Sequence, residues 1–224
     1  MEKAAIVLMG LPGVGKGTQA FKLINRFPNF THLDTGQEIK RRVDDPAFAH
    51  DPKVGRQRQV YYRGDPNDTV WVTGLISERI RSSAAEGKGV VLSGSPRKIY
   101  EAKRLGPLLK EIYRTQVLVI KLKALEETVR ERMLRRLVCD NPLCAFPAVR
   151  GKAPPLCPQC GEGKFSPKKL DSEEGISHRI GWYHSETVPG LEYLRALGPS
   201  VATLNAQDGE EEVFLRVVEL AEER

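Results

Sequence analysis

Residues Gly10 to Thr18 read GLPGVGKGT, a stretch in which four of the nine residues are glycine. An apolar segment typical of a buried strand, Ala4–Met9, precedes it, and helical spacing of apolar residues begins at Lys16. Glycine permits tight, left-handed turns, so successive backbone N–H groups can converge on phosphate oxygens at the positive end of a helix dipole. The stretch therefore predicts a phosphate-binding loop between a strand and a helix.

Two side chains of this loop carry the expected chemistry. The Lys16 ammonium would reach the β- and γ-phosphates of a nucleotide, and the Thr18 hydroxyl would face Mg²⁺. The strict form of the motif has Ser or Thr directly after the lysine, whereas Gly17 intervenes here. The alternative is a glycine-rich turn with an exposed lysine. Such a turn would not explain why a strand precedes the stretch and a helix follows it.

Short apolar runs alternate with longer amphipathic ones along the chain. The short runs predict buried strands at Ala4–Met9, Phe30–Leu33, Gly89–Ser93, Gln116–Leu122 and Val201–Leu204. Helical spacing predicts helices at Lys16–Arg26, Thr69–Ala85, Tyr100–Ile112, Leu125–Leu137, Glu174–Leu197 and Glu210–Glu222. This alternation favours an α/β fold in which helices cover both faces of a five-stranded parallel sheet. Two polar stretches, Asp44–Asp68 and Asp140–Lys169, are expected to be excursions from the sheet.

The composition excludes several classes of protein. The 224 residues are 40% hydrophobic and 29% charged, which is a globular balance and not that of a disordered or collagen-like chain. No apolar run approaches the ~20 residues of a membrane helix, and the N-terminal apolar segment is too short for a signal peptide. We therefore expect a cytoplasmic protein without a membrane partner. A monomer is a separate expectation.

The formal charge of +6 is concentrated in one part of the chain. Residues 130–169 carry nine basic and three acidic side chains, so the remainder is neutral in sum. Such a surplus can bind nucleic acid, a membrane surface or a phosphorylated small molecule. The basic residues are not interleaved with aromatic side chains, as stacking on nucleic acid would require, and we expect no nucleic-acid partner.

All four cysteines lie in the same basic segment, at Cys139, Cys144, Cys157 and Cys160. Their spacing resembles a zinc ribbon, because four thiolates can hold a tetrahedral Zn²⁺ in a closed structural site. A segment of about thirty residues has too little core to fold alone, so the metal would supply its stability. The alternative is four free cysteines that happen to be clustered. We expect zinc to have a structural role and no direct part in chemistry.

The stretch GLPGVGKGTQ resembles the opening of the adenylate kinase family of nucleoside monophosphate kinases. The resemblance implies a P-loop NTPase fold of three layers, with zinc-holding lids in some members. It implies reversible phosphoryl transfer from ATP-Mg to AMP, which yields two ADP. It further implies a core at residues 1–35, 65–131 and 170–224, a segment that binds the nucleoside monophosphate (NMP) at 36–64, and a zinc-ribbon lid at 132–169.

The HLDTG sequence at residues 32–36 is similar to the family's H-x-S-T-G block, which holds the acceptor nucleotide. This similarity implies acceptor-binding roles for Thr35 and Gly36. The family's following arginine is replaced by Lys40, which keeps the charge but loses the two-pronged guanidinium, and Arg41 could act from the next position. The alternative for these basic residues is a solvated helix face.

The GSPR sequence at residues 94–97 resembles the family's G-F-P-R, so Gly94 and Arg97 are expected to bind the acceptor phosphate. Glu101 stands where the family usually has a glutamine that reads adenine. A carboxylate offers only acceptors, which on hydrogen-bond grounds suits guanine better than adenine. The alternative is a surface helix residue paired with a nearby Lys or Arg. The acceptor base is therefore open, with AMP favoured by the family and GMP or another NMP as the alternative.

Two acidic residues that the family uses near Mg²⁺ are absent, because this chain has Gln37 and Ser93 in their places. Magnesium would then depend on Thr18, on the phosphates and waters, or on Asp34 as a substitute. The missing acids also leave open a non-catalytic nucleotide sensor. A further alternative is a zinc-ribbon ATPase that binds nucleic acid.

The donor side has its own pattern. Arg132 and Arg136 match the family's D-R-x-x-x-R and are expected on one face of a helix, at the ATP base and the γ-phosphate. After the lid, Lys168 stands for a family arginine, and Arg179 would bridge the phosphates of both nucleotides. Ala206 follows the last strand and would contact the ATP base through its backbone.

The expected mechanism is positioning and charge neutralisation, without a nucleophilic side chain. The expected catalytic residues are Lys16, Arg97, Arg132, Arg136 and Arg179. The expected ATP-binding residues are Gly13, Val14, Gly15, Lys16, Gly17, Thr18, Arg132, Arg136 and Ala206. The expected NMP-binding residues are Thr35, Gly36, Lys40, Arg41, Gly94, Arg97, Glu101, Lys168 and Arg179.

Overall fold

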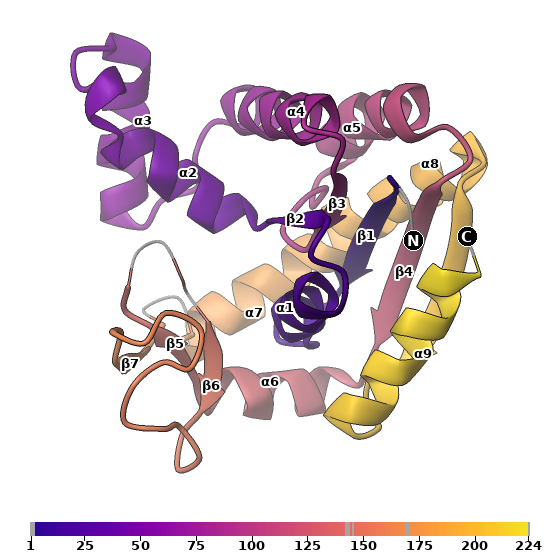
Figure 1. The fold of residues 1–224 in the computed structure, drawn as a ribbon. Coiled ribbons are helices and arrows are strands. Elements are labelled where there is room, and N and C mark those ends of the chain that lie inside the picture. Colours follow the sequence, from indigo (N-terminus) through magenta and orange to yellow (C-terminus); the bar gives the residue numbers. More distant parts are fainter. Residues whose placement is uncertain (1–2, 142–143, 145, 169–170, 224) are drawn as a thin grey trace.

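The structure is a computed structural model that describes residues 3–141, 144, 146–168 and 171–223. Its centre is a five-stranded sheet in the order β2-β3-β1-β4-β8, and every pairing in it is parallel (Figure 1). The strands are β1 (Ala5–Gly10), β2 (Phe30–Leu33), β3 (Gly89–Leu92), β4 (Val117–Lys123) and β8 (Ser200–Asn205). The expected α/β fold is confirmed, and each expected strand is present with small differences at its ends.

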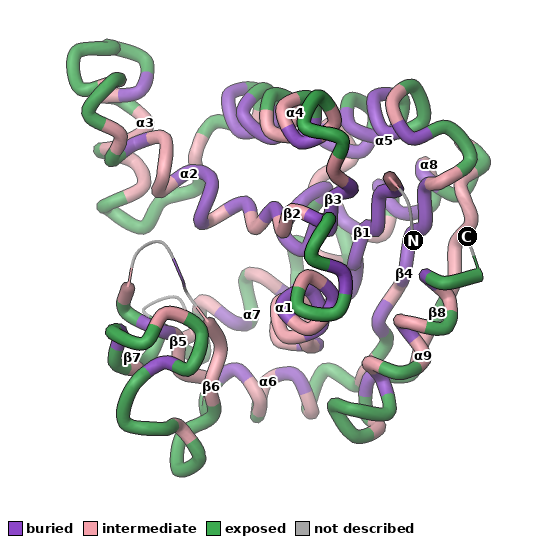
Figure 2. Tube along the Cα trace, viewed as in Figure 1, coloured by how far each residue is buried: buried purple, intermediate pink, exposed green. Residues whose placement is uncertain are grey.

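Helices cover both faces of this sheet because its central strands are apolar on both sides. Along β1, Val7 packs into one buried cluster, and Ile6 and Leu8 pack into the other. The first cluster is completed by α4 (Thr69–Ala85), α5 (Ile99–Tyr113) and α8 (Val188–Leu197). The second is completed by α1 (Lys16–Arg26), α6 (Glu126–Leu134), α7 (Glu173–Trp182) and α9 (Glu210–Glu222). Figure 2 shows β1, β3 and most of β4 buried between these layers. None of the helices in the described part of the chain is long and apolar enough to span a membrane.

The polar stretch Asp44–Asp68 contains more regular structure than the sequence indicates. Helix α2 (Thr35–Asp44) leads through a short 3-10 helix (Pro46–Phe48) into helix α3 (Pro52–Arg63). Val54 is the only residue of α3 that is buried, so the apolar spacing that would predict a helix is nearly absent. In Figure 1, α2 and α3 project from the sheet beside β2.

The prediction of a helix at Leu125–Leu137 is wrong for its last turn. Helix α6 ends at Leu134, and the chain continues as β5 (Arg136–Cys139). This strand is the centre of a small antiparallel sheet with β6 (Pro147–Val149) and β7 (Phe165–Pro167). Pairing on both edges gives the β5 backbone partners in place of helical ones, which is why the helix stops short.

The expected single helix Glu174–Leu197 is interrupted by a π-helical turn at Tyr183–Thr187. Helix α7, before the turn, buries Ile176 in one cluster, whereas α8, after it, buries Leu191 in the other. The turn therefore carries the chain from one face of the sheet to the other.

Candidate active site

The phosphate loop adopts the backbone that its glycines predict. Gly13 and Gly15 have φ angles of 80° and 108°, in the left-handed region that favours glycine. The Lys16 ammonium donates hydrogen bonds to the carbonyl oxygens of Gly10 and Leu11, each at 2.8 Å. These bonds hold the ammonium at the loop.

The other loop residues expected to bind ATP lie beside this lysine. Val14 is buried, and Gly17 and Thr18 belong to the first turn of α1. A β-carbon on Gly13 would lie 2.5 Å from the Met133 side chain of α6, so close packing also requires glycine there. The loop is thus held against the helix that leads to the lid.

Lys16 belongs to a cluster of positive charges at the edge where the parallel strands end. Burial lowers the pKa of Lys16 well below its ordinary value, and the charges of Arg97, Arg179 and Arg136 lower it further. The carboxylate of Asp34 acts in the opposite direction. Four of the five expected catalytic residues therefore meet at one place, although they come from four separate segments.

Lys168 extends this cluster, although solvent reaches its side chain. Neighbouring groups surround its ammonium and exclude much of the water from it. This desolvation is the main reason that the pKa of Lys168 falls to about 8. The charges of Arg136, Arg179 and Arg97 contribute in the same direction, and Asp34 opposes them. A site that lowers the pKa of its cations favours a bound polyanion, since the anion relieves their mutual repulsion.

Asp171 holds two of these arginines in place. Arg136 donates to both carboxylate oxygens of Asp171 at 2.8 and 2.7 Å, and Arg179 donates to one of them at 2.8 Å. The Asp171 side chain is only 4% exposed. Desolvation lowers the pKa of Arg179 to about 10, with repulsion from Arg136 as the second cause. From the sequence, Asp171 matches an acidic position of the family's R-x-D-D block but has no assigned role, and the structure supplies that role.

Arg132 and Arg136 are not on one helix face, which corrects the expectation for this pair. Arg132 lies in the last turn of α6, whereas Arg136 opens β5, because the helix ends between them. Arg132 donates to the carbonyl oxygen of Ala206 at 2.8 Å. Ala206 itself is buried directly after β8. The two residues expected at the ATP base are thus in contact with each other.

The expected acceptor side begins where β2 ends. The Thr35 hydroxyl lies 2.8 Å from that of Ser95, which joins the start of α2 to the loop after β3. A β-carbon on Gly94 would lie 2.6 Å from the backbone nitrogen of Thr35, so this glycine allows the close approach. Gly36 follows in the first turn of α2. Gly94 belongs to the same loop as Arg97, whose backbone N–H donates to Glu101 and whose carbonyl oxygen accepts from the Thr187 hydroxyl.

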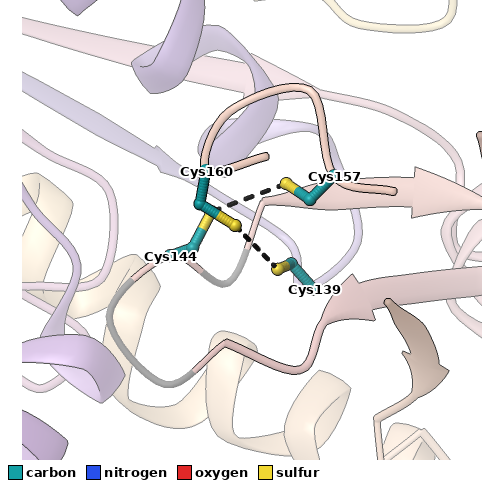
Figure 3. Close-up of side chains that lie close together, drawn as sticks. All are labelled: Cys139, Cys144, Cys157 and Cys160. Atoms are coloured by element: carbon teal, nitrogen blue, oxygen red, sulfur yellow. Dashed lines mark hydrogen bonds between the residues drawn. The ribbon is translucent and has the colours of Figure 1, made fainter. Parts of the chain in front are cut away.

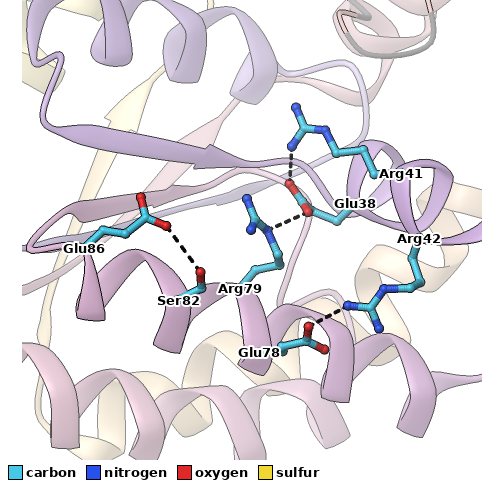
Figure 4. A network of polar contacts seen from close by, with 7 residues as sticks. All are labelled: Glu38, Arg41, Arg42, Glu78, Arg79, Ser82 and Glu86. Carbon is cyan, nitrogen blue, oxygen red and sulfur yellow. Dashed lines mark hydrogen bonds and ion pairs between the residues drawn. The ribbon is translucent and has the colours of Figure 1, made fainter. Parts of the chain in front are cut away.

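Lys40 and Arg41 are engaged elsewhere and are not part of the positive cluster. Lys40 contacts Asp44 at 2.5 Å and the Tyr62 hydroxyl at 3.3 Å. Arg41 pairs with the buried carboxylate of Glu38, which also pairs with an arginine of α4 (Figure 4). The charged network between α2 and α4 therefore fixes the root of the α2–α3 pair.

Glu101 is not the surface residue that one alternative predicted, because it is only 6% exposed. Its Oε2 accepts a hydrogen bond from the backbone N–H of Arg97 at 2.7 Å. The carboxylate thereby ties the first turn of α5 to the loop that carries Arg97.

The two positions without the family's acids have other partners. The Ser93 hydroxyl lies 2.7 Å from Nε2 of His32, and Gln37 donates to the carbonyl oxygen of Cys144. Phe21 of α1 also packs edge-on against Phe146, with ring centroids 5.3 Å apart. The cysteine-bearing segment therefore rests on α1 and α2.

The four cysteines converge, as their spacing predicts (Figure 3). Their sulfur atoms all lie within 4.8 Å of one another, and the pairs Cys139–Cys160 and Cys144–Cys157 are each 3.7 Å apart. Thiolates at about 2.3 Å from a tetrahedral zinc lie about 3.8 Å from each other. The donor set and its spacing thus fit a structural zinc ion.

A family profile and similar individual proteins all carry the same description. The profile of the family described as "Adenylate kinase" matches residues 8–198. A protein of Geobacillus sp. (strain WCH70) named "Adenylate kinase" is 30% identical over 222 residues, which cover 96% of this chain and 97% of that one. A protein of Staphylococcus epidermidis with the same name is 31% identical over 196 residues, or 86% and 87% of the two chains.

Proposed function

This chain belongs to the adenylate kinase family, and from that premise we propose that it is a nucleoside monophosphate kinase that transfers a phosphoryl group from ATP to AMP. The observation that carries the proposal is the meeting of Lys16, Arg97, Arg136 and Arg179 above a phosphate loop. Phosphates from two nucleotides, placed end to end, supply the negative charge that such a cluster lacks.

The transfer requires no nucleophile from the protein. An oxygen of the acceptor phosphate is already anionic, and it attacks the terminal phosphorus of ATP while the bond to the bridging oxygen breaks. Lys16 exchanges its two loop carbonyls for phosphate oxygens, and Arg97 holds the acceptor phosphate. Arg136 and Arg179, oriented by Asp171, neutralise the moving group. Mg²⁺ bound with ATP supplies further neutralisation of the phosphates.

The acceptor base that we propose is adenine. One oxygen of Glu101 already accepts the Arg97 N–H, and among the described residues the other oxygen has no backbone partner. The exocyclic amino group of adenine can satisfy that single oxygen, so the preference of a free carboxylate for guanine is reduced. At the acceptor phosphate we place Thr35, Gly36 and Gly94. Lys40 and Arg41 would turn to this phosphate only after they leave their present partners.

We also propose one structural Zn²⁺ held by the four cysteines, in a lid at residues 132–169. The remaining proposed divisions are a core at 1–35, 65–131 and 170–224, and an NMP-binding segment at 36–64. The boundary at residues 169 and 170 falls outside the described residues. A monomeric state, a cytoplasmic location and the absence of a nucleic-acid partner stay predictions from the sequence.

The test is an assay with ATP-Mg²⁺ and AMP, GMP, CMP or UMP as separate acceptors, with all nucleotides separated by chromatography. We expect AMP to give ADP at the highest kcat/KM. Preference for GMP would reject the adenine assignment alone. Nucleotide binding with no acceptor phosphorylated would reject the kinase and favour a sensor.

A further inference from the structure

Asp34 lies directly after β2, at the edge of the sheet where the parallel strands end. β2 and β3 are parallel, and their register pairs Leu33 with Leu92. The next residues along the two strands, Asp34 and Ser93, therefore lie at the same level, one strand apart. Neighbouring strands are about 4.8 Å apart. Asp34 therefore places a carboxylate one strand away from Ser93, the position at which this chain lacks the family's acid.

Two carboxylates act on the positive cluster, and they differ in what they already bind. Asp171 accepts three hydrogen bonds, from Arg136 and Arg179. Asp34 accepts one, from the backbone N–H of Gln37 to Oδ1 at 3.1 Å. Within the part of the chain that the structure describes, its Oδ2 has no hydrogen-bond or ion-pair partner.

The surroundings keep Asp34 ionised. Burial alone would raise the pKa of Asp34, but the charges of Lys168, His32 and Arg97 outweigh burial and lower that pKa. The same carboxylate raises the pKa of Lys16. Asp34 is therefore an anion at neutral pH, and its charge acts on the Lys16 ammonium of the phosphate loop.

Mg²⁺ in nucleotide sites keeps several waters and takes one or two carboxylates together with substrate phosphates. The donor set here is the Thr18 hydroxyl and the Asp34 carboxylate, both oxygen ligands of the kind that Mg²⁺ prefers. We propose that Asp34 is the positioning carboxylate of this chain, which accepts hydrogen bonds from the water shell of nucleotide-bound Mg²⁺. This inference rests on the proposed function, because it takes ATP-Mg²⁺ as the ligand of the phosphate loop.

A purely structural reading assigns Asp34 only the cap of α2 and attraction to nearby cations. Asn caps a helix about as well as Asp, so Asp34→Asn keeps the cap and removes the charge. Asp68→Asn is the matched control, because Asp68 caps α4 in the same way, by accepting from the backbone N–H of Trp71 at 2.7 Å.

The test measures ADP affinity by calorimetry with and without Mn²⁺, and Mn²⁺ affinity by electron paramagnetic resonance with ADP bound. For Asp34→Asn we expect Mn²⁺ affinity to fall about tenfold, the effect usual for loss of an outer-shell partner. Metal-free ADP affinity should stay equal or rise, because a negative charge leaves the cluster. Asp68→Asn should match the wild type, and adding Ser93→Asp to Asp34→Asn should restore Mn²⁺ affinity from the neighbouring strand.

Unchanged Mn²⁺ affinity in Asp34→Asn would overturn the inference, as would an equal loss of ADP affinity with and without metal. Neither result depends on turnover. A wild-type protein that binds Mn²⁺ with ADP but phosphorylates no acceptor would reject the proposed function and leave the role of Asp34 in place.

Discussion

The guanidinium of Arg136 and the carboxylate of Asp171 form a two-point hydrogen bond, with Nε and Nη2 each donating to a different oxygen at 2.8 and 2.7 Å. This geometry fixes the plane of the guanidinium as well as its position. Arg136 opens β5, the central strand of the small antiparallel sheet, and Asp171 precedes α7. The pair therefore joins this small sheet to the segment before α7, and Arg179 shares the same carboxylate.

Asp171→Asn should reduce both stability and turnover. The substitution keeps the shape of the side chain but leaves Arg136 and Arg179 without their counter-charge, and breaking a buried pair costs about 3 kcal/mol. We expect kcat to fall about 100-fold, because misplacing a charge that acts on the moving group has this size of effect. Urea unfolding and steady-state kinetics measure the two effects. Glu173→Gln is the control: its contact with Arg130 is long and exposed, and the substitution should change neither quantity.

Lys168→Met should change how stability depends on pH. The folded-state pKa of Lys168 is about 8, below the ordinary value of 10.5. Below pH 8 the folded protein therefore carries a disfavoured charge, and this penalty disappears as pH rises from 8 to 10.5. Without nucleotide, the Tm of Lys168→Met should exceed that of the wild type at pH 7, and the difference should shrink toward pH 10. Parallel Tm curves over this range would show that the site does not disfavour the charge.

Gly163→Ala should weaken metal binding without removing a ligand. A β-carbon at Gly163 would lie 2.1 Å from Sγ of Cys139, so the cluster has to open to admit it. Purified wild-type protein should contain about one zinc per chain, and the variant should lose zinc to a weaker chelator and melt at a lower temperature. Gly181→Ala, which meets open space on α7, is the control. Equal zinc retention in the two variants would argue against the proposed ion.

Arg97→Ala should lower kcat/KM for the acceptor by about 1,000-fold, since it removes a charged clamp on a phosphate. Arg97→Lys should recover only part of this loss, because lysine lacks the planar fork. Arg104→Ala removes an exposed arginine from α5, the helix that follows the Arg97 loop, and should leave the kinetics unchanged. A small effect of Arg97→Ala would place the acceptor phosphate elsewhere.

The local features of the molecule were predictable from the sequence. The central strands are buried on both faces, so they read as short continuous apolar runs, and glycine spacing marks the phosphate loop. Cysteine spacing likewise predicted the cluster around Cys139 and Cys157, because two close pairs bring four sulfur atoms within reach of one another.

The partnerships between distant residues were not predictable. Thirty-five residues separate Arg136 from Asp171, and nothing in the local pattern of either residue indicates the other. Leu134 and Leu137 fit helical spacing, so the switch from α6 to β5 depends on two partner strands that come later in the chain. The same holds for Glu101, whose burial depends on the loop it caps.

The most direct measurement starts from ADP and Mg²⁺ alone and follows all phosphates by ³¹P NMR. Transfer between two bound nucleotides predicts equal amounts of ATP and AMP at the expense of ADP, with no inorganic phosphate. Release of inorganic phosphate, or unchanged ADP in the presence of protein that binds it, would contradict phosphoryl transfer at the cluster around Lys16.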